Sequence, residues 1–143
     1  MAQRIEATTL WKYPDEAANR LSPQVLAYVG DAVFELYARC RLAGSKLKMD
    51  RMHGGVVGMV SAKAMAEHYK KLEPHLTETE ADVLHRGRNA KTRHSKSAGV
   101  GQYHMSTGFE ALVGYLFLSR QEDRLGQLLS YLLDEEDEST ESR

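Results

Sequence analysis

The segment from Leu21 to Arg41 constrains the fold of this chain more than any other. Its apolar residues recur at spacings of three and four, which is typical of a helix that buries one side. Ser22 followed by Pro23 predicts the N-cap and the first helical position, and Gly44 predicts the end. We therefore expect a helix of about five turns, packed deeply along one side. The residues of that side are Leu21, Val25, Leu26, Val29, Val33, Leu36, Tyr37 and Cys40.

Two poor helix formers, Gly30 and Asp31, lie together in the middle of this segment. Glycine costs about 1 kcal/mol relative to alanine in a helix, so a reason other than helix stability should keep them there. Asp31 shares a helical stripe with Gln24, Ala27 and Glu35. A carboxylate on that stripe could hold a metal ion, and Gly30 would let another backbone come close. The alternative is an aspartate that pairs with a lysine or arginine across a helix interface.

The rest of the chain predicts helices and no strand-like alternation, so the expected fold class is all-α. Thr77 and Glu80 form a capping box, and Glu73-Pro74 closes the preceding helix. The glycines between 54 and 58 should interrupt a long helix, which becomes regular only near Val60. The expected elements are a short helix over 15–20 and longer helices over 50–72, 77–89, 105–119 and 121–133.

The chain suits one soluble domain over residues 1–133, with 42% hydrophobic and 27% charged residues. The last ten residues, 134–143, carry six acidic residues and one arginine, which predicts an acidic, disordered tail and leaves the domain with a net charge of +4. The N-terminus lacks an apolar leader, and no apolar run could span a bilayer, so we expect a cytoplasmic protein. The single cysteine, Cys40, excludes an internal disulfide and a cysteine-based zinc site and is expected in the core.

Residues 85–104 form a basic stretch without any acidic residue, and it contains glycines at 87, 99 and 101. We interpret it as a helix end that runs into a basic loop, which suits contacts with nucleic-acid phosphates. The alternative is an ordinary solvated surface. The candidate RNA-binding residues are Arg86, Arg88, Lys91, Arg93 and Lys96.

Glu110 is a second candidate for chemistry, although with Thr107 it also occupies the positions of a capping box. The sequence lacks the motifs of other common catalytic and metal sites. The six histidines never fall at the HxxxH spacing of a helical zinc site, and no phosphate-binding glycine motif or nucleophile elbow is present.

Two acidic segments carry a resemblance to a known family. Residues 28–35, YVGDAVFE, resemble the signature helix of the ribonuclease III family, and residues 109–114, FEALVG, resemble its second acidic segment. Residues 60–63, VSAK, and 86–91, RGRNAK, are similar to the Mini-ribonuclease III branch. That branch consists of the catalytic domain without the usual double-stranded-RNA-binding domain.

The resemblance implies the helical, homodimeric catalytic-domain fold of that family and a magnesium-dependent endonuclease, with Mn²⁺ as a substitute, that cuts double-stranded RNA. The products would carry a 5′-phosphate and a 3′-hydroxyl, and the usual task of the branch is maturation of the large-subunit (23S) ribosomal RNA precursor. The implied partners are double-stranded RNA and a second copy of the chain, and a ribosomal protein could join them.

Residue by residue, Asp31 matches the metal-binding aspartate of the family and Glu110 its essential glutamate, so both are expected to be catalytic and to bind the metal ion. Ala27 and Thr107 stand where the wider family has a glutamate and an aspartate. The position seven residues before Asp31 is Gln24 rather than an acid. We therefore expect one well-held ion with several waters. Two alternatives stay open at this point: a non-catalytic factor that binds double-stranded RNA or assists ribosome assembly, and a helical DNA-binding module.

Overall fold

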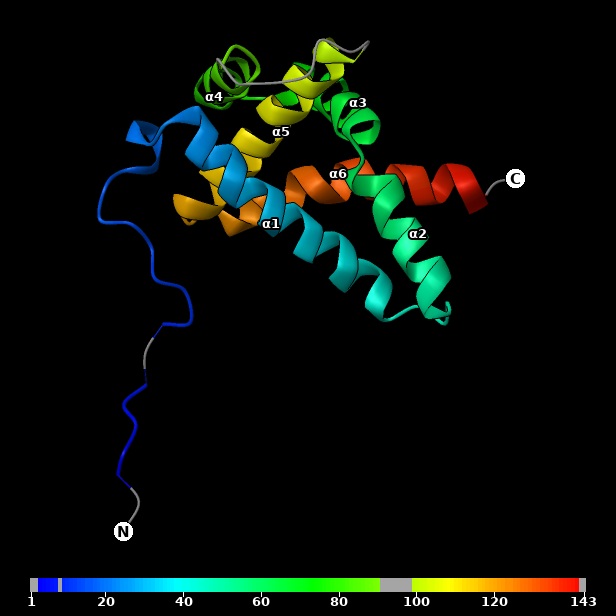
Figure 1. Ribbon diagram of the computed structural model, residues 1–143, viewed down its shortest axis with the longest axis horizontal. Helices are drawn as coiled ribbons and strands as arrows, with labels where there is room; N and C mark the ends of the chain where they lie inside the picture. The colour runs from blue at the N-terminus through cyan, green and yellow to red at the C-terminus, as the bar shows by residue number, and fades with distance from the viewer. Residues whose placement is uncertain (1–2, 8, 91–98, 142–143) are drawn as a thin grey trace.

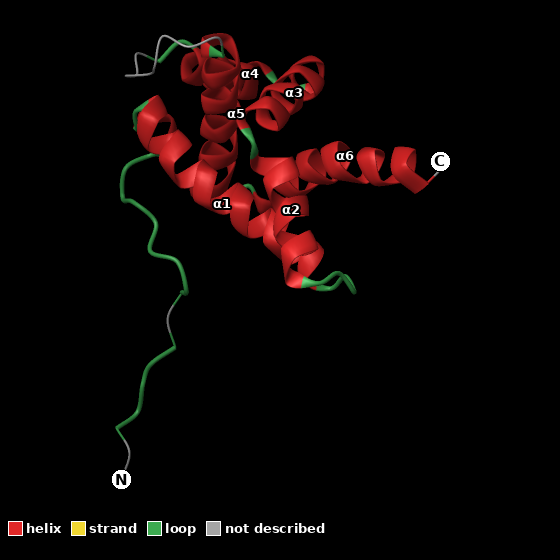
Figure 2. Ribbon diagram, turned by 45° about the vertical axis from the view of Figure 1, so that its right-hand side comes forward, coloured by secondary structure: helices red, strands yellow, loops and turns green. Residues whose placement is uncertain are grey.

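The computed structural model describes the backbone of residues 3–7, 9–90 and 99–141, and the side chains of these ranges up to residue 134. This part of the chain contains helices and no strand (Figure 2), which confirms the all-α prediction. Its elements are η1 (Ala18–Arg20), α1 (Pro23–Ala43), α2 (Met49–Val60), α3 (Ala62–Leu72), η2 (Glu73–His75), α4 (Glu78–Arg88), α5 (Val100–Leu118) and α6 (Glu122–Glu141).

Helix α1 begins and ends where the sequence predicts. The Ser22 hydroxyl accepts a hydrogen bond from the Val25 backbone N–H at 3.2 Å, Pro23 occupies the first turn, and Gly44 is the C-cap. These contacts satisfy backbone groups that a helix end otherwise leaves without an intrahelical partner.

The prediction of which face of α1 is buried is partly wrong. Val25 and Leu36 are 46% and 51% exposed, and Cys40 is exposed rather than in the core. The face that α5 covers passes through Gly30, and the exposed apolar residues lie on another side of the helix. Sequence periodicity could not separate the two faces because both are apolar. The buried residues of α1 are Leu26, Ala27, Gly30, Phe34 and Ala38.

Helix α5 lies at the centre of the fold, with α1, α3 and α4 packed against it (Figure 1). It is buried over most of its circumference, as expected of a central helix. Phe109 of α5 meets Phe34 of α1 edge-to-face, with ring centroids 5.0 Å apart. The helix begins at Val100, more than one turn before the predicted start at Met105. The prediction missed this turn because the residues ahead of Met105 show no apolar periodicity.

The single long helix predicted over 50–72 is two helices, and the break is not at the glycines. Gly54 and Gly58 lie inside α2, whereas Ser61 leaves the helical conformation. The Ser61 hydroxyl accepts from the Ala64 N–H at 3.2 Å and caps α3. A side-chain cap therefore separates α2 from α3.

The predicted ends of the other helices are confirmed in one case and corrected in others. The capping box at Thr77 and Glu80 opens α4 as predicted, with both reciprocal hydrogen bonds present. Only the short turn η1 forms where a helix over 15–20 was expected. Helix α6 continues to Glu141, beyond the predicted end at Leu133. The division of the chain into a domain over 1–133 and an acidic tail over 134–143 stays a prediction.

Candidate active site

The N-terminal halves of α1 and α5 face each other across a cavity of about 240 Å³, which we call the acidic cavity. Asp31 comes from α1 and Glu110 from α5, so residues that are far apart in the sequence meet here. The predicted stripe of Gln24, Ala27 and Asp31 lines this cavity together, whereas Glu35 forms an ion pair with Arg39. The full lining consists of Gln24, Ala27, Tyr28, Asp31, Tyr103, Thr107 and Glu110.

Two glycines allow α1 and α5 to approach closely enough to form the acidic cavity. A Cβ atom on Gly30 would overlap the backbone carbonyl oxygen of Glu110 and lie 2.7 Å from its carbonyl carbon. A Cβ atom on Gly114 would likewise overlap the carbonyl oxygen of Leu26. The expectation that Gly30 admits another backbone is therefore confirmed, and the backbone it admits is the one that carries Glu110.

The carboxyl groups of Asp31 and Glu110 interact directly. Burial, the negative charge of Asp31 and a hydrogen bond to Asp31 raise the pKa of Glu110 to about 8. In the described residues, Asp31 forms no ion pair with a lysine or arginine, so the alternative of a structural ion pair is wrong for that part of the chain. At neutral pH the Glu110 carboxyl group therefore holds its proton in the metal-free protein.

A divalent cation fits the chemistry of this pair. Mg²⁺ prefers oxygen ligands, and two carboxylates from different helices offer oxygens across a cavity open to solvent. A cation between them would stabilise the ionised form of Glu110 against burial and the negative charge of Asp31, which together keep Glu110 protonated. Within the described residues, no group of three or more Asp, Glu, His or Cys side chains could hold a metal ion. Asp31 and Glu110 are the residues that could hold such an ion.

The capping-box interpretation of Thr107 and Glu110 is wrong. Both residues lie inside α5, and the Thr107 hydroxyl donates to the backbone carbonyl of Tyr103 at 3.0 Å. The Glu110 carboxyl group is therefore turned toward Asp31 rather than back toward a helix end.

The predicted RNA-binding residues lie at and beyond the end of α4. Arg86 forms an ion pair with Asp82 at 3.1 Å. Arg88 donates to the buried Tyr69 hydroxyl at 2.8 Å and to the Asn89 side chain at 3.2 Å, so it also holds α4 against α3. Lys91, Arg93 and Lys96 fall outside the described residues.

Tyr103 is a cavity residue that the sequence interpretation missed. It lies seven residues before Glu110, the same separation as Gln24 from Asp31. A search for polar side chains at helical spacing from each carboxylate would have found it, once α5 was known to begin before Met105.

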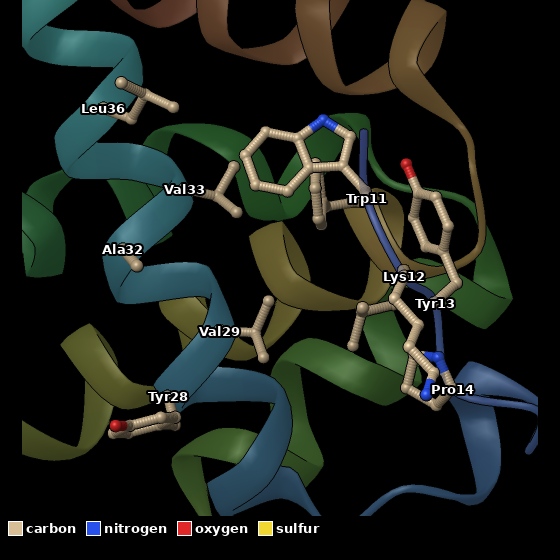
Figure 3. Close-up of a pocket in the computed structure, with 11 residues that line it drawn as sticks. Trp11, Lys12, Tyr13, Pro14, Tyr28, Val29, Ala32, Val33 and Leu36 are labelled. Carbon is tan, nitrogen blue, oxygen red and sulfur yellow. The ribbon is translucent and has the colours of Figure 1, made fainter. Parts of the chain in front are cut away.

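A second cavity of about 390 Å³ lies between the exposed apolar face of α1 and the N-terminal segment 11–14, and we call it the apolar groove. In Figure 3, Val29 and Val33 point toward the segment that carries Trp11 and Tyr13. The Trp11 ring contacts the Phe117 ring edge-to-face at 5.5 Å. Along the described residues, no helix combines the length and the apolar character needed to cross a membrane.

This chain is similar to known proteins over most of its length. Residues 24–121 match the model of the Ribonuclease III domain. The Mini-ribonuclease 3 of Gloeobacter violaceus is 46% identical over 80% of this chain and 84% of that protein. The Mini-ribonuclease 3 of Clostridium tetani is 33% identical over 92% of this chain and 89% of that protein.

A solved structure extends the likeness to the fold. The crystal structure of protein FN1578 from Fusobacterium nucleatum superposes with a TM-score of 0.76 at 25% identity, over 85% of this chain and 99% of that chain. The matched range contains both carboxylates of the acidic cavity and the helices that carry them. The chain therefore belongs to the ribonuclease III family, among the Mini-ribonuclease III proteins.

Proposed function

We propose that this protein binds a Mg²⁺ ion between Asp31 and Glu110 and hydrolyses double-stranded RNA at the acidic cavity. Membership of the ribonuclease III family makes the chain an endoribonuclease of a divalent-metal-dependent family that acts on double-stranded RNA. The observation that carries the residue assignment is the convergence of these two carboxyl groups, from separate helices, on one open cavity. Mn²⁺ has similar ligand preferences and would substitute.

The two carboxylates have a defined task in this reaction. Asp31 and Glu110 present oxygens from opposite walls, so a phosphate in the cavity can approach them from the open side. Glu110 would hold the ion in its ionised form, since a bound cation would favour loss of the Glu110 proton. A magnesium ion, when bound, lowers the pKa of a water molecule and neutralises charge on the scissile phosphate. Attack of a water oxygen on phosphorus, in line with the P–O3′ bond that breaks, would leave a 5′-phosphate and, once the 3′-oxygen takes up a proton, a 3′-hydroxyl.

The proposal assigns RNA contacts to the basic segment after α4. Duplex RNA displays phosphates and 2′-hydroxyls on accessible surfaces, so backbone contacts should dominate over base reading. The proposed substrate is the large-subunit ribosomal RNA precursor in the cytoplasm, with a ribosomal protein as a further partner. The residues proposed for these contacts are Arg86, Arg88, Lys91, Arg93 and Lys96.

We further propose a homodimer that forms through the exposed face of α1. Three apolar or aromatic side chains on this face are exposed, at 46% for Val25, 83% for Tyr28 and 51% for Leu36. All three belong to α1, the helix that forms one side of the apolar groove. Apolar surface of this kind on a single helix is typical of a contact between protein chains. A two-fold axis at this face would give the dimer two acidic cavities, one for each strand of the RNA duplex.

A cleavage assay tests the proposed activity. Parent protein, Asp31→Asn and Glu110→Gln are incubated with duplex RNA and Mg²⁺ or Mn²⁺, and the products are resolved by size. We expect the parent to cut and both variants to lose cleavage by orders of magnitude while still binding the duplex. Equal cutting by all three proteins would refute the site assignment. An inert parent that still binds duplex RNA would favour a non-catalytic RNA-binding role, and equal affinity for DNA duplexes would favour a DNA-binding module.

A further inference from the structure

Residues 11–14, which we call the strap, are held against the end of α5 by three side-chain contacts. The Trp11 ring meets the Phe117 ring edge-to-face, and the centroid of the Tyr13 ring lies 5.7 Å from that of Phe117. The guanidinium carbon of Arg120 lies 4.5 Å from the centroid of the Tyr13 ring, which is a cation–π contact. The residues ahead of the strap extend away from the helices (Figure 1), and Leu10 is 84% exposed.

The backbone at Arg120 gives a second indication that this contact matters. In the part of the chain that the structure describes, Arg120 is the one non-glycine residue with a positive φ, at 59°. Its N–H donates to the Phe117 carbonyl at 3.1 Å, and the Gln121 N–H donates to the Leu116 carbonyl at 2.8 Å, so Arg120 ends α5. Glycine usually occupies such a position, because other residues rarely adopt this conformation. The contact with Tyr13 provides a physical reason for an arginine here.

The strap and α1 form two walls of the apolar groove. Trp11 and Tyr13 lie on one wall, and Val33 and Leu36 on the other (Figure 3). Both walls remain open to solvent, since Trp11 is 45% exposed and Leu36 is 51% exposed. Aromatic and apolar side chains that face one open groove indicate a contact with a further apolar surface.

The charge and position of the groove favour a second copy of this chain as its occupant. Among the residues that line the groove, Lys12 alone is charged. A two-fold contact sets one patch against the same patch, so an almost uncharged lining avoids repulsion between like charges. The groove is also continuous with the face of α1 proposed for the homodimer, because Leu36 belongs to both. One partner surface can therefore cover α1 and the strap together.

We propose that the strap is part of the homodimer contact, in which the apolar groove receives apolar side chains from α1 of a second copy and the partner buries Trp11. The inference rests on the proposed function, because it takes the α1 face as the dimer contact. It extends this contact to residues outside 24–121, the range that matches the Ribonuclease III domain. Arg120 and Tyr13 act as positioning residues that hold the strap in place for the partner.

The fluorescence of Trp11 tests the contact directly. Trp11 is the only tryptophan of the chain, so tryptophan emission reports on the strap alone. The full chain is diluted in steps, and sedimentation velocity and emission are measured at each concentration. On dimer formation we expect the emission maximum to shift to shorter wavelength and quenching by acrylamide to decrease, because the ring leaves water. Both changes should follow the monomer–dimer transition, and Leu36→Glu should keep the monomer emission throughout.

Substitutions of the clamp test the role of Tyr13 and Arg120. Tyr13→Ala and Arg120→Gly each remove the cation–π contact, and a symmetric dimer loses it twice. Each variant should raise the dissociation constant of the dimer about 5- to 30-fold. Arg120→Gly also suits the positive φ, so its circular dichroism spectrum should match that of the parent.

Two control variants separate the clamp from a general loss of side chains. Tyr13→Phe keeps a ring beneath Arg120 and should change the dissociation constant by no more than about twofold. Arg51→Ala removes an exposed arginine from α2, outside the groove, and should leave the dissociation constant unchanged.

The possible failures of this inference and of the proposed homodimer can be told apart. A dimer that forms without any change in Trp11 emission or quenching refutes the strap contact and leaves the homodimer standing. A parent that stays monomeric at every concentration refutes both. If Tyr13→Ala and Arg120→Gly dimerise as the parent does, the clamp has no role in the contact. Emission that is independent of concentration but changes in Ile5→Ser would show that the chain's own N-terminal residues fill the groove, which also overturns the proposal.

Discussion

Replacement of Gly30 by alanine should separate the two helices that form the acidic cavity. The new Cβ atom would lie 2.7 Å from the Glu110 carbonyl carbon and 2.8 Å from the Gly114 nitrogen, against 3.4–4 Å for an ordinary contact. The obstructing atoms belong to the backbone, so no rotamer change can relieve the overlap. Helices α1 and α5 must therefore move apart by at least about 0.7 Å to restore 3.4 Å.

The cost of this movement can be bounded. Overpacking of a core costs about 1–3 kcal/mol and occasionally more. The rigid backbone puts Gly30→Ala at the upper end of that range, while the better helix propensity of alanine returns about 1 kcal/mol. We expect a net loss of about 2 kcal/mol or more in the free energy of unfolding. Because Asp31 and Glu110 also lose their relative placement, we expect cleavage to fall on the order of 100-fold, the effect of a misplacement near 1 Å.

Urea unfolding and a cleavage assay with saturating Mg²⁺ measure the two effects. Gly58→Ala is the matched control, since Gly58 lies inside α2 and a Cβ atom there meets open space. That variant should gain about 0.5–1 kcal/mol and cut at the parent rate. If Gly30→Ala unfolds at the parent's urea concentration and cuts as fast, the close approach of α1 and α5 is not what builds the site.

Three further predictions follow from the same structure. The folded protein holds a proton on Glu110 up to about pH 8, whereas the unfolded chain releases it near the ordinary pKa of 4.5, so the free energy of unfolding of the metal-free protein should decrease between these pH values. Glu110→Gln should abolish this part of the pH dependence in urea titrations, and an unchanged profile would contradict the raised pKa of Glu110. Neutralising Lys91, Arg93 and Lys96, the three basic residues beyond α4 in the sequence, should weaken RNA binding. The slope of log affinity against log salt concentration should fall by about three, one for each lost charge. An unchanged slope in binding titrations at several salt concentrations would refute their role, and Arg88 is left intact because it bonds Tyr69. Leu36→Glu should convert the proposed dimer into a monomer in sedimentation velocity, whereas Leu47→Glu, at a 41% exposed site away from the apolar groove, should not. A dimer that survives Leu36→Glu would place the contact elsewhere.

The local features of this protein could be predicted from its sequence because short-range chemistry decides them. Ser22 and Pro23 begin α1, and Thr77 and Glu80 begin α4, since a cap depends on residues within one turn. The same holds for Gly30, whose poor helix propensity indicated a close backbone before any partner was known. The identity of the two carboxylates followed from the resemblance of their segments to a family.

The tertiary structure alone decided which apolar face of α1 is buried. Periodicity predicted one apolar side, but α5 crosses at Gly30 and covers Leu26 and Phe34, so Val25 and Leu36 stay exposed. A helix with apolar residues on two sides does not specify which side its neighbour will cover, because burial depends on where the neighbour crosses.

The electrostatics of the site also required the fold. The pKa of Glu110 rises to about 8 because the residue is partly buried and faces Asp31, and neither condition can be found in the residues next to it in the sequence. Tyr103 entered the site only because α5 begins at Val100, earlier than the apolar pattern indicated. The sequence by itself determined the all-helical fold class, the caps of α1 and α4 and the two acids. The three-dimensional packing determined that the acids line one cavity and that the pKa of Glu110 is raised, since charge coupling and burial depend on distances that only the folded chain has.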